Sequence, residues 1–249
     1  MNRVHVSENA EGLAEAAAAF IHQRIITGLK ANPRFSLVLS GGNTPRKTYR
    51  RLAACAASID WSNVDIFWGD ERCVPHDHPD SNFRMARETL LSQLPVPPGN
   101  IHPMGCDPSP EAGARAYEAE LHQLFPGQGL PRFDLVLLGL GGDGHTASLF
   151  PGTGALAENQ RWVVANWVEK LDTWRLTLTL PVLNAAQIVT FLVEGGEKAD
   201  ILKQILEGSK GRFPAQRINP AVGEVHWFID HDSGAGLQEG GTVGATGSA

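Results

Sequence analysis

The chain has 249 residues, of which 42% are hydrophobic and 19% are charged, and its formal net charge is -6. A length of this order supports one large hydrophobic core or two small ones. The mildly acidic balance leaves no basic footprint for nucleic acid, and no apolar run is long enough to span a bilayer. We therefore expect neither nucleic acid nor a membrane as a partner. The N-terminal segment lacks the layout of a signal peptide, so we expect a cytoplasmic protein.

Strand-like and helix-like segments alternate along the chain. The predicted strands are short apolar runs, at residues 3–6, 35–42, 64–70, 133–141, 162–168, 175–180, 188–195 and 224–230. The predicted helices have amphipathic spacing, at residues 7–32, 44–55, 81–94, 111–125 and 197–206. Apolar strands that alternate with helices indicate a parallel sheet covered on both faces. We predict one α/β domain over residues 1–236, a doubly wound, mostly parallel open sheet of the Rossmann-like type.

Several local features refine this outline. Capping or first-turn residues stand at three predicted helix starts: Ser7 or Asn9, Thr44 with Pro45, and Ser81 or Asn82. The strand at 175–180 alternates polar and apolar residues, so we expect it at a sheet edge or with one face in solvent. Residues 237–249 are rich in Gly, Ser, Thr and Ala and are predicted to form a flexible tail.

The three cysteines, Cys55, Cys73 and Cys106, are irregularly spaced, and none belongs to a CxxC pair. An odd number at such spacing argues against a disulfide framework and against a structural zinc site. We therefore expect three free thiols in a reducing cytoplasm.

Polar clusters follow four of the predicted strands. In open α/β sheets, ligands bind beyond the carboxyl ends of the strands, so these clusters are expected to meet on one rim. They are Ser40-Gly41-Gly42-Asn43-Thr44-Pro45, Asp70-Glu71-Arg72, Gly141 to His145, and Lys198. The spacing therefore predicts a single ligand site built from four strand ends.

The glycine-rich turn at residues 40–45 runs into a predicted helix start. Exposed backbone N–H groups and the helix dipole favour an anion there, and Ser40, Asn43 and Thr44 can add donors. A plain strand-to-helix turn capped by Thr44 explains the same residues equally well. Neither GxxxxGK[ST] nor GxGxxG is present, which disfavours nucleoside triphosphates and NAD and favours a smaller phosphorylated ligand.

The segment GLGGDGHTASLFPG, residues 139–152, places Asp143 and His145 among glycines and before a helix-like segment. Residues two apart on an extended backbone point the same way. Histidine is the side chain whose ordinary pKa suits proton transfer near neutral pH. The glycines leave room for a substrate and offer N–H donors to a developing negative charge. These features favour proton transfer over a dinucleotide turn, whose glycine spacing is not met.

The segment VPHDHPDSN raises a metal hypothesis, because His76, Asp77, His78 and Asp80 are all possible ligands. Consecutive residues rarely converge on one ion, however, and no known zinc spacing is present. We expect no metal here. A polar loop that covers the site and leads into the helix at Ser81 is the favoured interpretation.

Together these blocks resemble the 6-phosphogluconolactonase family. The matching segments are LVLSGGNTP, WGDERCVPHDHPDSNFRMARETLL, LLGLGGDGHTASLFPG, RLTLTLPVLNAA and the ending PA…VHWFID, in the family's order and within residues 10–235 or so. The resemblance implies an enzyme of the oxidative pentose phosphate pathway that hydrolyses 6-phospho-D-glucono-1,5-lactone to 6-phosphogluconate. It also implies that the enzyme needs no cofactor or obligatory metal and acts as a monomer.

The resemblance also assigns roles to residues. His145 looks like the general base that activates water, Asp143 would orient it, and Arg72 would bind ligand and stabilise charge. Substrate and phosphate contacts are implied for Ser40, Gly41, Gly42, Thr44, Asp70, Arg175 and Lys198.

Two rival functions stay open. One is a glucosamine-6-phosphate deaminase or sugar-phosphate isomerase of the same superfamily; such deaminases place a glutamate five residues after the histidine, where this chain has Phe150. The other is a non-catalytic sugar-phosphate sensor, which in this superfamily carries a DNA-binding module; no basic extra segment is evident in this sequence. No GxSxG elbow suggests a serine nucleophile.

Overall fold

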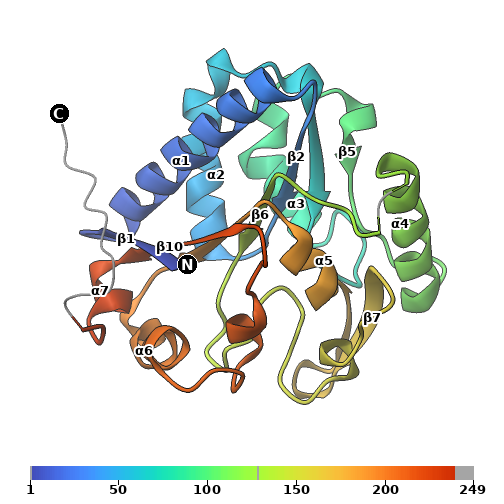
Figure 1. Cartoon of the computed structure of the whole chain (residues 1–249). Coiled ribbons are helices and arrows are strands. Elements are labelled where there is room, and N and C mark those ends of the chain that lie inside the picture. Colours follow the sequence, from blue (N-terminus) through green and yellow to red (C-terminus); the bar gives the residue numbers. More distant parts are fainter. Residues whose placement is uncertain (1, 128, 239–249) are drawn as a thin grey trace.

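A seven-stranded parallel sheet forms the centre of the computed structural model, which describes residues 2–127 and 129–238 (Figure 1). Its strand order is β1-β10-β9-β6-β2-β3-β5, and every neighbouring pair is parallel. The strands are β1 (Asn2–Ser7), β2 (Phe35–Leu39), β3 (Val64–Trp68), β5 (Ile101–His102), β6 (Leu135–Leu138), β9 (Ile188–Val193) and β10 (Glu224–Asp230). The predicted parallel open sheet is confirmed.

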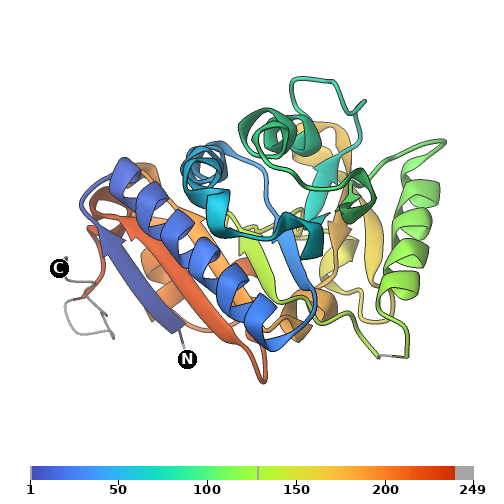
Figure 2. The same ribbon diagram turned by 90° about the horizontal axis from the view of Figure 1, so that it is seen from above.

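Helices cover this sheet because their apolar faces must be buried against its apolar strands. They are α1 (Ala10–Ala31), α2 (Asn43–Cys55), α3 (Asn82–Thr89), α4 (Pro110–Leu124), α5 (Leu180–Ala185), α6 (Ala199–Glu207) and α7 (His231–Gly234). Figure 2 shows α1 lying along β1 and β10, while α6 lies on the opposite side of the sheet in Figure 1.

A second, three-stranded antiparallel sheet has the order β4-β8-β7 and was not expected from the sequence. Its strands are β4 (Asp70–Arg72), β7 (Val163–Val168) and β8 (Thr173–Leu178). The prediction of an edge position for residues 175–180 is wrong, because β8 pairs with a strand on each side. The alternative of one face in solvent is also wrong, because Thr177 and Thr179 are as buried as the neighbouring leucines. Their hydroxyls donate to main-chain carbonyls, which lets the polar positions of the alternating pattern lie in the interior.

Gly69 joins the two sheets. Its N–H donates to the carbonyl of Leu39 in β2 at 2.9 Å, and its own carbonyl accepts from the N–H of Leu178 in β8, also at 2.9 Å. One continuous hydrophobic cluster contains Leu39 from the parallel sheet as well as Leu176 and Leu178 from the antiparallel sheet. The two sheets therefore belong to a single folded unit.

The expectation of three free thiols is wrong. Cys73 and Cys106 form a disulfide, with their Cα atoms 5.3 Å apart, whereas Cys55 is free and exposed. Cys73 directly follows β4 and Cys106 lies after β5, so two loops that are 33 residues apart in sequence meet at one end of the molecule. The cysteines therefore give no support to a reducing compartment.

The helix starts and the tail differ in part from prediction. Asn9 caps α1 and Ser81 caps α3, each accepting an N–H bond of the first turn. Thr44 is not a cap, since α2 begins at Asn43 with Gly42 preceding it. The predicted tail starts at 237, yet Leu237 packs against the core; residues 239–249 lie outside the described part.

No helix follows His145 directly. Residues 146–153 form turns and an isolated bridge between Thr146 and Leu149. The side chains of this segment bind other parts of the chain: Thr146 donates to Gly139 at 2.9 Å, and Ser148 donates to Asp70 at 2.6 Å. Such side-chain bonds compete with helix formation, which explains the wrong prediction.

Within the described ranges, no helix is long and apolar enough to cross a membrane.

Candidate active site

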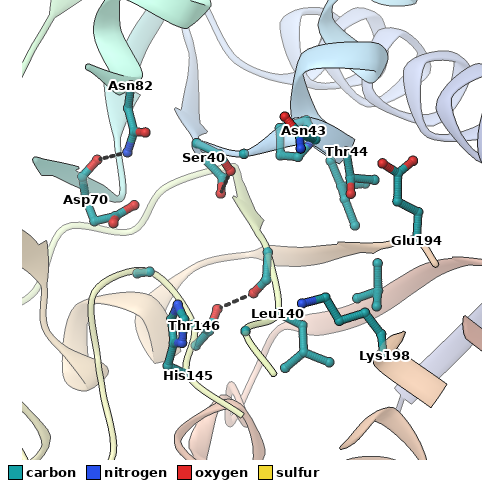
Figure 3. A pocket seen from close by; sticks show the side chains of 18 of the residues that line it. Ser40, Asn43, Thr44, Asp70, Asn82, Leu140, His145, Thr146, Glu194 and Lys198 are labelled. Carbon is teal, nitrogen blue, oxygen red and sulfur yellow. Dashed lines mark hydrogen bonds between the residues drawn. The ribbon is translucent and has the colours of Figure 1, made fainter. Parts of the chain in front are cut away.

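A cavity opens where the topology of the parallel sheet reverses (Figure 3). β2 and β6 are neighbours, and the chain continues from β2 to β3 on one side and from β6 to β9 on the other. Open α/β sheets bind ligands at such a switch point. The cavity has a volume of about 320 Å³, and its walls contain all the predicted site residues except Asp143: Ser40, Gly41, Gly42, Thr44, Asp70, Arg72, His145, Arg175 and Lys198.

The turn after β2 is held by buried groups. The Ser40 N–H donates to the Tyr49 hydroxyl at 2.8 Å, and that hydroxyl donates to the Ser40 carbonyl at 2.8 Å. Burial raises the pKa of Tyr49, which keeps the hydroxyl a neutral donor. A Cβ on Gly41 would lie 1.9 Å from Oδ1 of Asn82, so only glycine fits this approach. The fixed turn leads into the N-terminus of α2, a favourable place for an anion.

Asp70 is anchored at the rim by two residues that the sequence analysis did not identify. The amide of Asn82 donates to the Asp70 carbonyl at 2.9 Å, and the hydroxyl of Ser148 donates to Oδ2 of its carboxylate. Asn82 lines the cavity as well. Both residues lie in segments interpreted from sequence as helical, and their contacts depend on distant pairing, so no local signal indicated them.

Arg72 and Arg175 are register partners in adjacent antiparallel strands and face the same cavity. Arg72 donates to the carbonyl of Asp80. Nε of each guanidinium is buried and has no hydrogen-bond partner among the described residues. Burial lowers the pKa of Arg175, and the neighbouring charge of Arg72 lowers it further. Two adjacent cations with unsatisfied donors are suited to bind an anion.

His145 and Asp143 form a direct pair. Nδ1 of His145 lies 2.5 Å from Oδ1 of Asp143, and the two meet across a turn at Gly144 rather than along an extended strand. A Cβ on Gly141 would lie 2.0 Å from Nδ1 of His145, so glycine leaves space for the ring. Because Asp143 accepts from Nδ1, the second ring nitrogen is the one left to accept a proton.

Burial and charge set the protonation of this pair. Burial lowers the pKa of His145, and the hydrogen bond to Asp143 offsets only part of that effect. Burial would raise the pKa of Asp143, but bonds from Lys170 and His145 outweigh it and bring that pKa to about 2. At neutral pH the histidine is therefore a neutral base beside an ionised carboxylate.

Phe150 stands beside the His145 imidazole, five residues after the histidine, where related deaminases place a glutamate. Its ring stacks on that of His145, with centroids 4.0 Å apart. Phe150 is buried, and the carboxylates whose charges act on His145 among the described residues are Asp143 and the anchored Asp70.

Lys198 lies across the cavity from the Ser40–Thr44 turn (Figure 3). Glu194, which follows β9, also lines the cavity and forms an ion pair with Lys47 at 3.1 Å. Glu194 and Lys47 were not identified from the sequence, since a charged residue after a strand is common at any surface.

The loop at residues 76–80 does not line the cavity, but the Asp80 carbonyl accepts from Arg72, which does. Nε2 of His76 lies 2.7 Å from the carbonyl of Met104, which draws the loop toward a separate cavity near the disulfide. In the part of the chain that the structure describes, no group of three or more His, Cys, Asp or Glu side chains is arranged to hold a metal ion.

Comparisons with known proteins identify the family of this chain. A family model described as glucosamine-6-phosphate isomerases/6-phosphogluconolactonase matches residues 8–227. The 6-phosphogluconolactonase of Synechocystis sp. is 42% identical over 241 residues, covering 95% of this chain and 98% of that protein. The 6-phosphogluconolactonase of Rattus norvegicus is 39% identical, covering 91% of this chain and 90% of the relative.

Solved structures give the same result. The 6-phosphogluconolactonase of Trypanosoma brucei has a TM-score of 0.84 at 31% identity, covering 96% of this chain and 99% of that one. A monomeric glucosamine-6-phosphate deaminase has a TM-score of 0.79 at 23% identity, which shows a shared fold. This chain belongs to the glucosamine-6-phosphate isomerase/6-phosphogluconolactonase family.

Proposed function

We propose that this chain hydrolyses 6-phospho-D-glucono-1,5-lactone to 6-phospho-D-gluconate, in the oxidative pentose phosphate pathway. The observation that carries the proposal is the neutral His145, paired with Asp143, opening into the same cavity as the glycine-rich anion turn. Relatives named 6-phosphogluconolactonase that align over nearly the whole chain support it.

In the proposed reaction, the second ring nitrogen of His145 takes a proton from a water molecule, and the hydroxide attacks C1 of the lactone. Asp143 holds the imidazole in position and stabilises the imidazolium that forms. The tetrahedral intermediate then collapses, and its ring C–O bond breaks. The ring oxygen leaves with the proton from His145, and the carboxylic acid product ionises. A lactone is an activated ester, so no covalent nucleophile is required.

Different groups would bind the phosphate of the substrate and stabilise the charge that develops at its C1. The turn at Ser40–Thr44 and Lys198 lie on facing walls and would bind the phosphate, which supplies binding energy for orientation. Arg72 and Arg175, with buried donors left unsatisfied, would stabilise the oxyanion that develops at C1. The sequence resemblance implied a phosphate role for Arg175; its position beside Arg72 favours the lactone end.

The experiment is a lactone hydrolysis assay with purified protein, corrected for spontaneous hydrolysis by an enzyme-free blank. Wild type should accelerate hydrolysis, and His145→Ala should lower kcat by about 10²–10⁴-fold while the protein stays folded. Near-normal turnover by His145→Ala would remove His145 from the mechanism.

An assay with glucosamine 6-phosphate as substrate distinguishes the proposed lactone hydrolysis from a deaminase activity. Phe150 stacks on His145 where related deaminases place a glutamate, so ring opening lacks its second carboxylate and no ammonia should form. Release of ammonia would favour the deaminase. Saturable binding of 6-phosphogluconate with no lactone turnover would favour a sensor.

A further inference from the structure

Lys170 reaches the His145–Asp143 pair from a different part of the fold. It lies in a short turn, Glu169–Leu171, between β7 and β8, and is 27 residues from Asp143 in the chain. Its ammonium group donates to Oδ2 of Asp143, while Oδ1 of the same carboxylate is bound to His145. One carboxylate therefore links a surface hairpin to the imidazole.

Four side chains, that of Asp143 included, form a closed ring of contacts. The Lys170 Nζ also lies over the ring of Phe150, 4.7 Å from its centroid, and Phe150 stacks on His145. Lys170 thus touches both groups that hold the imidazole, yet it does not line the cavity. Its place in the hairpin is fixed by Asp172, a left-handed residue with φ of 49° whose N–H donates to the Glu169 carbonyl at 3.1 Å.

We propose that Lys170 is a positioning residue: it holds Asp143 against His145 and places its own positive charge beside the imidazole, so that the ring keeps its basic nitrogen toward the substrate. The proposal rests on the proposed role of His145 as the base. Under this proposal, the hairpin between β7 and β8 affects the reaction although Lys170 does not contact the substrate.

The charged groups near His145 predict how its pKa should change when Lys170 is replaced. They are Asp143 on its own loop, Lys170 on the hairpin and Asp70 on β4. Burial is the largest cause of the lowered pKa of His145; among the charges, Asp143 and Asp70 favour the protonated ring and Lys170 opposes it. Loss of the lysine charge should therefore raise the pKa of His145. Since the base must be neutral to act, the acid limb of kcat/KM should move to higher pH.

The test compares Lys170→Met, Lys170→Gln and Lys170→Arg, with Glu169→Gln as the matched control in the same turn. The two neutral variants should lose about tenfold in kcat/KM at neutral pH, well short of the loss expected on removing the base itself. Their acid limb should move to higher pH. Lys170→Arg should restore the wild-type profile, and Glu169→Gln should not change it.

A purely structural lysine would lower the melting temperature without moving the acid limb, and an unmoved limb in folded Lys170→Met and Lys170→Gln would overturn the proposal. A second measurement does not depend on turnover. The His145 ring signal, assigned by its loss in His145→Gln, is titrated by NMR in the free protein. If wild type fails to hydrolyse the lactone but the His145 pKa rises in Lys170→Met, the proposed function fails and the effect of the Lys170 charge on His145 stands. An unchanged His145 pKa contradicts that effect.

Discussion

The two sheets supply different chemistry to one cavity. The parallel sheet contributes turns after β2 and β6, and residues of both turns, including His145, line the cavity. The antiparallel sheet contributes charged side chains, namely Asp70, Arg72 and Arg175. The parallel sheet thus supplies the glycine-rich turns, His145 and, after β9, Lys198, while the small sheet supplies Asp70 and the arginine pair.

The two contributions reach the cavity by different routes. Parallel strands end at the same edge, so the turns that follow β2 and β6 meet whatever their sequence. The position of the small sheet is not set by parallel topology. It depends on two links: the hydrogen bonds of Gly69 to both sheets, and the disulfide that follows β4. Breaking these links should affect charge placement more than it affects the turns.

The largest expected effect comes from the disulfide, because it joins the end of β4 to the segment after β5, the edge strand of the parallel sheet. The double variant Cys73→Ser/Cys106→Ser should lose about 2–4 kcal/mol of unfolding free energy, since the bridge closes a long loop. Urea unfolding of the oxidised wild type and the double variant measures the difference. Cys55→Ser, at the exposed free cysteine, is the control and should unfold like wild type. Equal stability of all three proteins would show that the bridge does not hold the sheets together.

The cations of the two sheets provide the next test. Lys198→Met, at the parallel sheet, should raise KM about 10- to 100-fold with little change in kcat, because a charged hydrogen bond contributes about 1.5–3 kcal/mol. Arg175→Met, at the small sheet, should lower kcat as well, because its partner is the oxyanion of the transition state. Steady-state kinetics with the lactone separates the two. A change in KM alone for Arg175→Met would place the phosphate at the arginine pair instead.

A smaller effect is expected within the anion turn. Gly41→Ala would put a methyl group against the Asn82 side chain, which supports Asp70, and overpacking of this kind costs about 1–3 kcal/mol. The substitution should therefore disturb both sheets, lowering stability and raising KM. Gly142→Ala is the matched control, since its added methyl group would meet no described residue beyond its chain neighbours within 4 Å. Similar behaviour of the two variants would mean that the close approach of Gly41 to Asn82 is not required.

The contrast between the two sheets also explains which features could be predicted from the sequence. The parallel sheet and its turns were predictable because apolar runs, glycines and capping residues are local signals. Asp143 and His145 were identified for the same reason: both lie in one glycine-rich segment, and the turn at Gly144 brings them together.

The small sheet was not predictable by these means, because its pairing is long-range. Nothing near Arg72 indicates that Arg175 lies beside it, and nothing near Cys73 indicates Cys106 as its partner. Lys170 was missed for the same reason, since an exposed hairpin lysine looks like any solvated charge. Lys198 was predicted from its place after a strand, whereas Arg175 came only from the resemblance to a known family, which did not supply its position beside Arg72.

The smallest expected effect concerns the end of the parallel sheet away from the small sheet, where β1 pairs with β10. Nε2 of His5 lies 2.9 Å from Nδ1 of His226, and Nε2 of His226 lies 3.0 Å from Glu224. Burial lowers the pKa of both histidines from their ordinary value of 6.5; the nearby Arg3 and Arg24 lower both further, while Glu224 partly offsets the effect at His226. The unfolded chain then binds protons more readily than the folded chain as the pH drops below 6.5.

The contribution of this histidine pair to the free energy of unfolding should therefore be fully present above pH 6.5. It should decline as the pH falls through 6.5 toward the lower pKa values of the folded protein. Amide hydrogen exchange at about pH 7.5 and about pH 5, corrected for intrinsic rates, should show lost protection in β1 and β10 at the lower pH, while β8 stays protected. His5→Gln should reduce the acid effect, whereas His231→Gln, at an exposed histidine, should not. Equal loss of protection in β8 would show that acid weakens the whole molecule, and the two sheets would then not respond separately.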